Sequence, residues 1–96
     1  MPAGDRVERE FTVCGELGLH ARPTSRFVSM AIGFASEVSV GKDGEWVSGK
    51  SVLSILSLAA GPGSVVRVRA EGPDAEQAVA ALGELLEGFR DAGQSI

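Results

Sequence analysis

The stretch EVSVGKDGEWVS, residues 37–48, decides the fold class of this 96-residue chain. Valines alternate with polar residues over 37–42, a pattern that indicates a half-buried β-strand. Asp43-Gly44 is a favoured dipeptide for a two-residue hairpin turn. Residues 45–48 then predict the returning strand, with Trp46 packed. The stretch therefore predicts an antiparallel hairpin near the middle of the chain.

The sequence on both sides of the hairpin predicts strands interspersed with helices. Alternation of apolar and polar residues marks the further strands, and apolar residues at helical spacing mark the helices. The predicted elements are strands at 7–13, 37–42, 45–48 and 64–70, and helices at 22–35, at 51–58 and after the turn at 72–74. This order, β-α-β-β-α-β-α, predicts an α+β sandwich in which helices cover an antiparallel sheet.

Length, composition and charge exclude several classes of protein. With 44% hydrophobic residues the chain can form one core, and we expect one domain, 1–96, with its core at about 7–90. A net charge of −4 argues against nonspecific nucleic-acid binding. The sequence shows no secretory leader and no apolar run long enough to span a membrane. We therefore expect a cytoplasmic protein without nucleic-acid binding or membrane insertion.

The single cysteine, Cys14, permits no intramolecular disulfide and is expected to be a small core residue. One histidine and one distant cysteine do not make a metal-coordination set. The sequence also lacks the Gly-x-x-x-x-Gly-Lys-Ser/Thr loop that binds nucleotide phosphates. We expect no metal, no cofactor and no direct use of a nucleotide.

Acidic residues are absent from residues 17–36 and 46–70. These two windows contain five of the nine basic residues, namely Arg22, Arg26, Lys50, Arg67 and Arg69. Two explanations of this pattern stay open: chance combined with the preference of basic residues for helix ends, or a locally positive face of the protein. Arg67 and Arg69 alternate with apolar residues on a predicted strand and are expected to face away on the sheet, so a positive face would consist of Arg22, Arg26 and Lys50.

The only histidine, His20, lies in the stretch Gly18-Leu19-His20-Ala21-Arg22-Pro23. Since proline is tolerated only in the first turn, the helix must begin close to His20. Free N–H groups at a helix start favour bound anions such as phosphate, and Arg22 adds donors for phosphoryl oxygens. His20 is therefore predicted either to bind an oxyanion as a cation or to attack phosphorus as a neutral nucleophile. A purely structural histidine is the alternative.

These residues resemble the active-site motif of the HPr family, the histidine-containing phosphocarrier proteins of the bacterial phosphoenolpyruvate-dependent phosphotransferase system. The resemblance covers about residues 8–89 and includes the order of the elements. A second stretch, Gly49-Lys50-Ser51-Val52-Leu53, is similar to the family's regulatory-serine segment. The resemblance implies an HPr-like open-faced sandwich, in which three helices cover one face of a four-stranded antiparallel sheet. Two residues depart from the family's pattern: Gly15 stands where asparagine is common, five positions before His20, and Thr24 stands where alanine is common.

The resemblance also implies a phosphoryl relay through this chain. Enzyme I, phosphorylated by phosphoenolpyruvate, would donate a phosphoryl group to Nδ1 of His20, and an EIIA-type acceptor would receive it next. Arg22 would hold the phosphoryl group during the transfer. On this interpretation the chain is a monomeric carrier with a transient phosphohistidine and not a self-sufficient enzyme.

Ser51 has a structural and a regulatory interpretation. Serine is a favoured N-cap, and a very apolar helix follows it directly. In family members from bacteria that contain HPr kinase/phosphorylase, this serine is phosphorylated, and the added charge opposes the histidine reaction. The serine alone leaves open whether such a kinase is a partner of this chain.

The apolar helix at 51–58 predicts either burial on both sides or an exposed apolar patch for a partner. Ile55 and Leu58 are expected to fill the core. By resemblance, the partner-binding patch that packs against enzyme I and EIIA domains consists of Val52, Leu53 and Leu56. Arg26 either adds positive charge at the edge of this patch or is an ordinary solvated residue.

Two other functions stay open from the sequence. A nitrogen-type or regulatory HPr paralogue would control its partners by its state of phosphorylation. A small non-catalytic α+β binding module would use His20 only to cap a helix. The sequence does not name the sugar or the regulator at the end of the relay.

Overall fold

The computed structural model describes residues 5–13, 21–61 and 63–92. In chain order it contains β1 (Asp5–Thr12), α1 (Ala21–Ile32), β2 (Glu37–Lys42), β3 (Glu45–Ser48), α2 (Val52–Ser57), β4 (Val65–Gly72) and α3 (Ala75–Ala92). The predicted order β-α-β-β-α-β-α is therefore confirmed. None of the helices in the described residues is long and apolar enough to cross a membrane.

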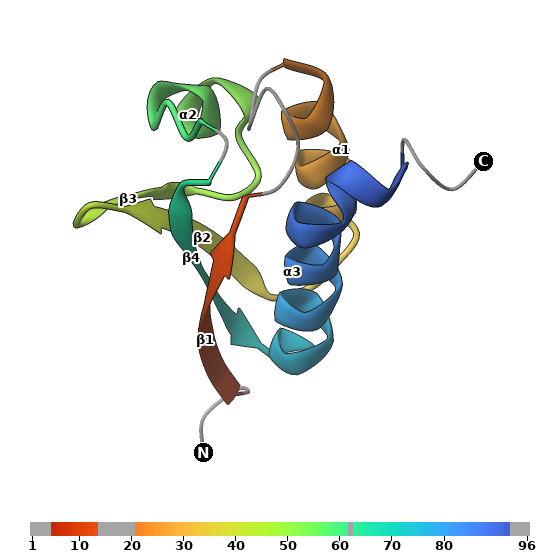
Figure 1. The fold of residues 1–96 in the computed structure, drawn as a ribbon. Coiled ribbons are helices and arrows are strands. Elements are labelled where there is room, and N and C mark those ends of the chain that lie inside the picture. The colour runs from red at the N-terminus through yellow and green to blue at the C-terminus, as the bar shows by residue number, and fades with distance from the viewer. Residues whose placement is uncertain (1–4, 14–20, 62, 93–96) are drawn as a thin grey trace.

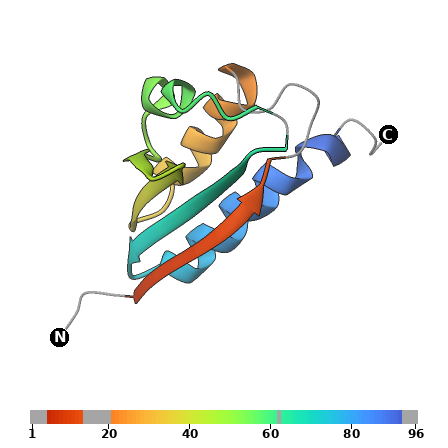
Figure 2. The ribbon, with the colours of Figure 1, turned by 60° about the vertical axis from the view of Figure 1, so that its left-hand side comes forward.

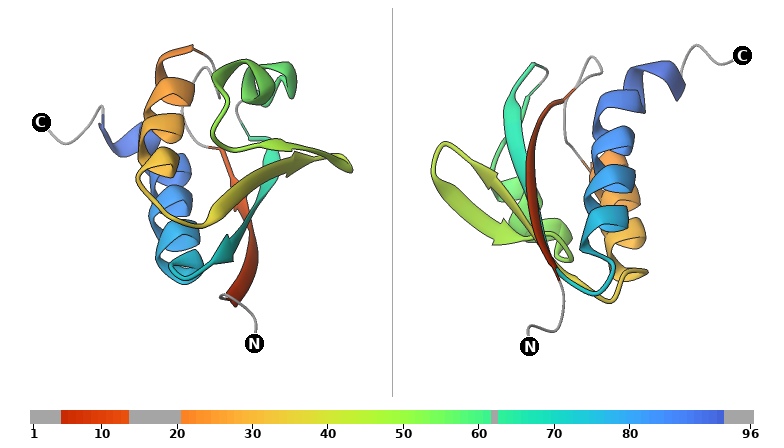
Figure 3. Two further views of the ribbon diagram at one scale, coloured as in Figure 1. Left: turned by 180° about the vertical axis from the view of Figure 1, so that it is seen from behind. Right: turned by 90° about the horizontal axis from the view of Figure 1, so that it is seen from below.

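The four strands form one antiparallel sheet in the order β1-β4-β2-β3. Helices α1 and α3 lie side by side against one face of this sheet, and the shorter α2 lies at one end of the same side (Figures 1 and 3). The opposite face of the sheet is left uncovered by helices (Figure 3). The predicted open-faced sandwich is confirmed.

The core lies between the sheet and the helices. Because side chains alternate across a strand, β2 and β4 turn one set of residues toward the helices and the other toward the uncovered face. The helices contribute their apolar faces, with Phe27 and Ala31 from α1 and Leu82 from α3 at most 1% exposed. The inward strand residues, all at most 4% exposed, are Val38, Val40, Val66, Val68 and Ala70.

The central hairpin has the geometry that its sequence predicts. Asp43 has a φ of 53° and Gly44 a φ of 85°, and a type I′ turn needs both residues in the left-handed region. Beyond the turn, Trp46 of β3 is paired with Gly41 of β2. A Cβ atom on Gly41 would lie 2.8 Å from the indole ring, so the glycine makes room for the ring on the sheet.

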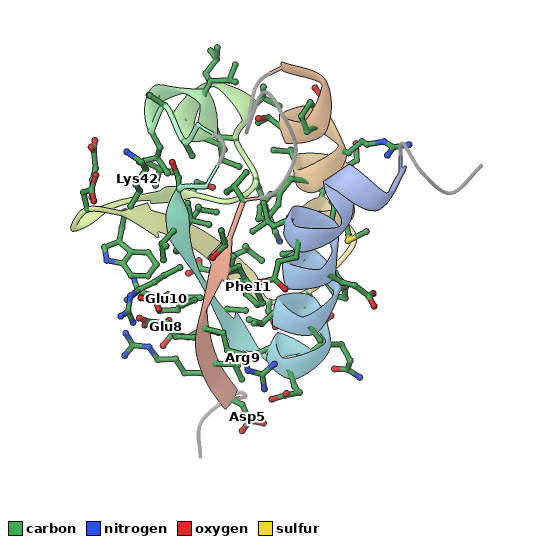
Figure 4. All side chains as sticks on the ribbon, in the orientation of Figure 1. Asp5, Glu8, Arg9, Glu10, Phe11 and Lys42 are labelled. Atoms are coloured by element: carbon green, nitrogen blue, oxygen red, sulfur yellow. The ribbon has the colours of Figure 1, made fainter. Side chains whose placement is uncertain are left out.

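Strand β1 and helix α3 are held close together along their lengths (Figure 2). A Cβ atom on Gly83 of α3 would lie 2.1 Å from the ring of Phe11, so the ring packs directly against the helix backbone. Arg9 of β1 donates to the carboxylate of Glu76, in the first turn of α3, at 2.5 Å. Figure 4 shows Phe11 and Arg9 pointing from β1 toward α3.

Three element ends differ from the prediction by two residues or more: β1 begins at Asp5 and not at residue 7, and the ends of α1 and β4 are shifted as well. Helix α1 ends at Ile32 and not at residue 35, because the next N–H groups bond to the carbonyl three residues back instead of four: Gly33 N–H donates to Met30 O and Phe34 N–H donates to Ala31 O. Strand β4 continues beyond residue 70 to Gly72, because its last residues remain paired with β1, where Gly72 lies opposite Asp5.

Candidate functional site

Helix α1 begins at Ala21, the residue that follows His20 in the sequence, and Pro23 lies in its first turn. This turn contains no acidic residue, so no carboxylate of its own competes with an anion for the N–H groups there. His20 and Cys14 lie outside the described residues, as does the side chain of Arg22. The roles assigned to these three residues stay predictions.

The segment that carries His20 connects two elements that are fixed on the core. On one side, Val13 is 1% exposed, and both of its backbone groups are bonded: its N–H donates to Ser64 O at 2.8 Å, and its carbonyl accepts from Gly63 N at 2.9 Å. On the other side, Phe27 and Val28 of α1 are buried in the core. The described residues on both sides of residues 14–20 are therefore anchored in the core.

Thr24 lies on the buried face of α1, near the helix start. Its side chain is fully buried, and its Oγ1 has no hydrogen-bond partner among the described residues. A buried hydroxyl without a partner is unfavourable, so Thr24 contributes less stability than an apolar residue of its shape would.

Ser51 caps helix α2, as the structural interpretation predicts. Its backbone is extended, with φ −126° and ψ 115°, and its Oγ accepts from Ser54 N at 3.3 Å. Its carbonyl accepts from Ile55 N at 3.1 Å, the first bond of the helix. The hydroxyl that is the candidate for phosphorylation thus lies at the positive end of α2.

Lys50 was predicted as a basic residue of a positive face, but its ammonium group is engaged within the fold. Its Nζ donates to the carbonyl of Phe34, just beyond the end of α1, at 3.1 Å. The backbone at this point is hydrogen-bonded too: Lys50 N donates to Ser48 Oγ at 3.1 Å, and Gly49 N donates to Val38 O at 2.7 Å. The sequence carries no signal for this contact, because it joins residues 16 positions apart.

Helix α2 buries one side and exposes the other. Ile55 is fully buried and Leu58 is 5% exposed, so both lie in the core as predicted. Leu53 is 79% exposed, and Val52 and Leu56 are half-buried. Of the two alternatives for this helix, the structure therefore favours an exposed apolar face.

Arg67 and Arg69 point to the uncovered face of the sheet, as expected from the alternation of β4. Arg67 pairs with Glu8 at 3.1 Å and with Glu10 at 3.2 Å. Arg69 lies 3.9 Å from Glu8 and 4.0 Å above the ring of Trp46. Figure 4 shows Glu8 and Glu10 on the side of β1 opposite to Arg9 and Phe11. These two arginines are thus separated from the start of α1 by the sheet.

A polar contact between Ser36 and Asp74 joins the turn before β2 to the turn before α3. Ser36 Oγ donates to the Asp74 carboxylate at 2.5 Å, and the N–H groups of Ala35 and Ser36 each donate to it at 2.9 Å. These bonds, with that of the Ser36 side chain foremost, hold the pKa of Asp74 below its ordinary value of 3.8, although partial burial opposes the shift. This contact was not predicted from the sequence.

Within the described residues, no group of three or more histidine, cysteine, aspartate or glutamate side chains could hold a metal ion. Among the described residues, the site offers the start of α1, the exposed apolar side of α2 and the hydroxyl of Ser51. These features can bind and position a partner, and phosphoryl transfer depends mainly on the binding and positioning of the reacting groups.

Known proteins share both this fold and this sequence pattern. A family model described as "PTS HPr component phosphorylation site" matches residues 7–88. The phosphocarrier protein HPr of Xylella fastidiosa is 42% identical over 81 residues, which is 84% of this chain and 91% of the relative. The HPr-like protein Crh of Halalkalibacterium halodurans is 41% identical over 81 residues, 84% of this chain and 96% of the relative.

Among solved structures, the phosphocarrier protein HPr from Bacillus anthracis superposes with a TM-score of 0.83. It is 39% identical and covers 85% of this chain and 98% of its own. The fold and the sequence together thus define a small open-faced sandwich of the phosphocarrier class. The chain belongs to the HPr family.

Proposed function

We propose that this chain is a phosphocarrier protein that accepts a phosphoryl group on His20 and passes it on. The observation that carries the proposal is the motif at residues 18–23, located at the start of α1 in a chain whose residues 7–88 match the HPr family. Residues 1–96 form one HPr-like domain, and it operates in the cytoplasm.

The transfer requires a nucleophile and stabilisation of charge. Nδ1 of neutral His20 attacks phosphorus of the phosphorylated enzyme I, so that one bond to the donor breaks as an N–P bond forms. The guanidinium of Arg22 and the free N–H groups at the start of α1 stabilise the negative oxygens. An EIIA-type acceptor then attacks the same phosphorus and releases the imidazole. Each step needs the partner protein, so the chain is a carrier and not a self-sufficient enzyme.

The partners dock on the exposed side of α1 and α2, which we call the α1–α2 surface and define by Arg26, Val52, Leu53 and Leu56. Helix α2 and the start of α1 lie at the same end of the molecule (Figure 1). A protein that reaches His20 therefore covers both helices. The exposure of Leu53, at 79%, supports this assignment, because an exposed leucine gains from burial by a partner.

Ser51 is a second site of phosphorylation in this proposal, used for regulation. Its position as the N-cap of α2 supports this, since a phosphate there meets the positive end of the helix while adding charge beside the docking surface. The HPr kinase/phosphorylase is the proposed partner for this reaction. The similarity to an HPr-like protein Crh keeps a regulatory paralogue as the second candidate function.

A reconstituted relay tests the proposal and separates the candidates. Phosphoenolpyruvate, enzyme I, this chain and an EIIA domain are combined, and the phosphate on EIIA is followed over time. A carrier makes labelling of EIIA depend on this chain, and His20→Ala abolishes it. A regulatory paralogue becomes phosphorylated but leaves EIIA unlabelled, and a simple binding module is never phosphorylated.

A further inference from the structure

Two polar side chains are fully buried among the described residues, and they differ in their hydrogen bonds. Ser36 is paired, because its Oγ donates to the Asp74 carboxylate at 2.5 Å. Thr24 Oγ1 is the only buried side-chain polar atom of the described residues that has no hydrogen-bond partner. Buried polar atoms are almost always paired, because an unpaired one has lost its bonds to water without replacement. The fold of the unphosphorylated chain therefore gives no structural reason for this hydroxyl.

The position of Thr24 in α1 places its hydroxyl near the first turn of the helix. Helix α1 begins at Ala21, and Thr24 is its fourth residue. Side chains in a helix lean toward its N-terminus, and a threonine hydroxyl can donate to the carbonyl three or four residues back. The residue three positions before Thr24 is Ala21. Rotation of the Thr24 side chain would thus offer the hydroxyl to the Ala21 carbonyl, a bond that is not made in this structure.

The Ala21 carbonyl belongs to the same peptide unit as the N–H group of Arg22. This N–H lies in the first turn of α1, where N–H groups have no partner within the helix, and the proposed function assigns such groups to the phosphoryl oxygens. When an N–H group donates to an anion, its peptide unit is polarised, and the carbonyl of that unit becomes a stronger acceptor. A phosphoryl group on His20 would therefore strengthen the carbonyl that Thr24 can reach.

We propose that Thr24 is a positioning residue for phosphoryl transfer, whose hydroxyl donates to the Ala21 carbonyl when His20 is phosphorylated and has no partner when it is not. This inference rests on the proposed function. The bond stabilises the first turn of α1 while its N–H groups hold the phosphoryl oxygens. Because only the phosphorylated state contains this bond, the hydroxyl shifts the equilibrium of phosphoryl transfer toward the phosphorylated chain.

The test measures how the phosphoryl group is distributed between phosphoenolpyruvate and this chain. A small amount of enzyme I brings the chain, phosphoenolpyruvate and pyruvate to equilibrium. Intact mass then gives the phosphorylated fraction at several ratios of phosphoenolpyruvate to pyruvate. A difference in the equilibrium constant between variants reports only on the two states of the chain, because enzyme I is a catalyst and its docking does not change an equilibrium.

Three substitutions separate the hydroxyl of Thr24 from the packing of its side chain. Thr24→Val keeps the volume and removes the hydroxyl, and we expect the equilibrium constant to fall about fivefold, the effect of one hydrogen bond. Thr24→Ser keeps the hydroxyl and removes a buried methyl group, so it should lower the urea midpoint but leave the equilibrium constant within about twofold of the wild type. Thr24→Ala removes both groups and should match the valine variant in the equilibrium constant, so it replaces that variant if valine prevents folding.

The outcomes distinguish this inference from the function on which it rests. If the wild-type chain is phosphorylated but the variants without the hydroxyl keep its equilibrium constant within about twofold, the role of Thr24 is wrong and the carrier function stands. The same holds if Thr24→Ser lowers the constant as much as Thr24→Val, since packing and not the hydroxyl would then determine it. If enzyme I does not phosphorylate the wild-type chain at any ratio, both proposals are wrong.

Discussion

The Ser51 hydroxyl oxygen accepts a hydrogen bond of 3.3 Å from the backbone N–H of Ser54. The oxygen that would carry a regulatory phosphate is thus the oxygen that caps α2. Helix capping and phosphorylation are compatible at this position, because a phosphate or carboxylate also accepts hydrogen bonds from the N–H groups of a helix start.

Replacing Ser51 with alanine is therefore expected to lower the stability of the protein, and replacing it with aspartate is not. Ser51→Ala removes the acceptor and should lower the free energy of unfolding by about 1 kcal/mol. Ser51→Asp keeps an acceptor at the cap and should equal or exceed the wild type in stability. Urea unfolding of the three proteins checks this order. An alanine variant as stable as the wild type would contradict the cap.

Gly83→Ala should destabilise the protein although alanine is the better helix former. The added Cβ would lie 2.1 Å from the Phe11 ring, so β1 and α3 must move apart or the ring must turn. Overpacking of this kind costs about 1–3 kcal/mol, against a gain of about 1 kcal/mol in helix propensity. We expect a net loss of up to about 2 kcal/mol in the free energy of unfolding, measured in urea.

Two further variants control the Gly83 experiment. Gly61→Ala places a Cβ where no atom of the described residues beyond its chain neighbours lies within 4 Å, and its stability should be unchanged within about 0.5 kcal/mol. Phe11→Leu combined with Gly83→Ala should recover part of the loss, since the smaller side chain makes room. Strictly additive effects of the two substitutions would refute the contact.

Thr24→Val should stabilise the protein. The hydroxyl is fully buried without a partner among the described residues, and valine retains the branched shape while removing the polar atom. A gain of about 1 kcal/mol in the free energy of unfolding is expected. A comparable loss would show that the hydroxyl is hydrogen-bonded in solution.

Acid should weaken the fold partly through Asp74. The pKa of Asp74 in the folded protein lies below its ordinary value of 3.8, because Ser36 Oγ and backbone N–H groups donate to the carboxylate. A lowered folded pKa adds stability above the unfolded value, and this is lost as pH falls through the folded pKa. Between about pH 5 and pH 2 the wild type should therefore lose more stability than Asp74→Asn. Parallel pH profiles of the two proteins would count against this role.

The sequence predicted the elements better than it predicted their contacts. Alternating valines and Asp43-Gly44 specify the hairpin because strand period and turn geometry are local properties. The same applies to Pro23 and the start of α1, and to Ser51 as a cap. By contrast, the tighter last turn of α1 and the continuation of β4 to Gly72 depend on partners elsewhere in the chain.

The contacts that could not be predicted join residues far apart in sequence. Glycine is intrinsically unfavourable inside a helix, and the place of Gly83 is explained only by the packing of α3 on Phe11. Lys50 looked like a free cation, but its contact with Phe34 O requires knowing where α1 ends. For His20 and Arg22, the motif and the family carry the assignment, since both side chains lie outside the described residues.

The most direct test of the central claim is whether enzyme I and phosphoenolpyruvate place a phosphoryl group on His20. The protein is incubated with both, and the intact mass and the acid and base lability of the adduct are measured for the wild type and for His20→Ala. We predict one phosphoryl group per wild-type chain, labile in acid and stable in base, and none on His20→Ala. Absence of the adduct from the wild type, or its persistence in His20→Ala, would contradict the account.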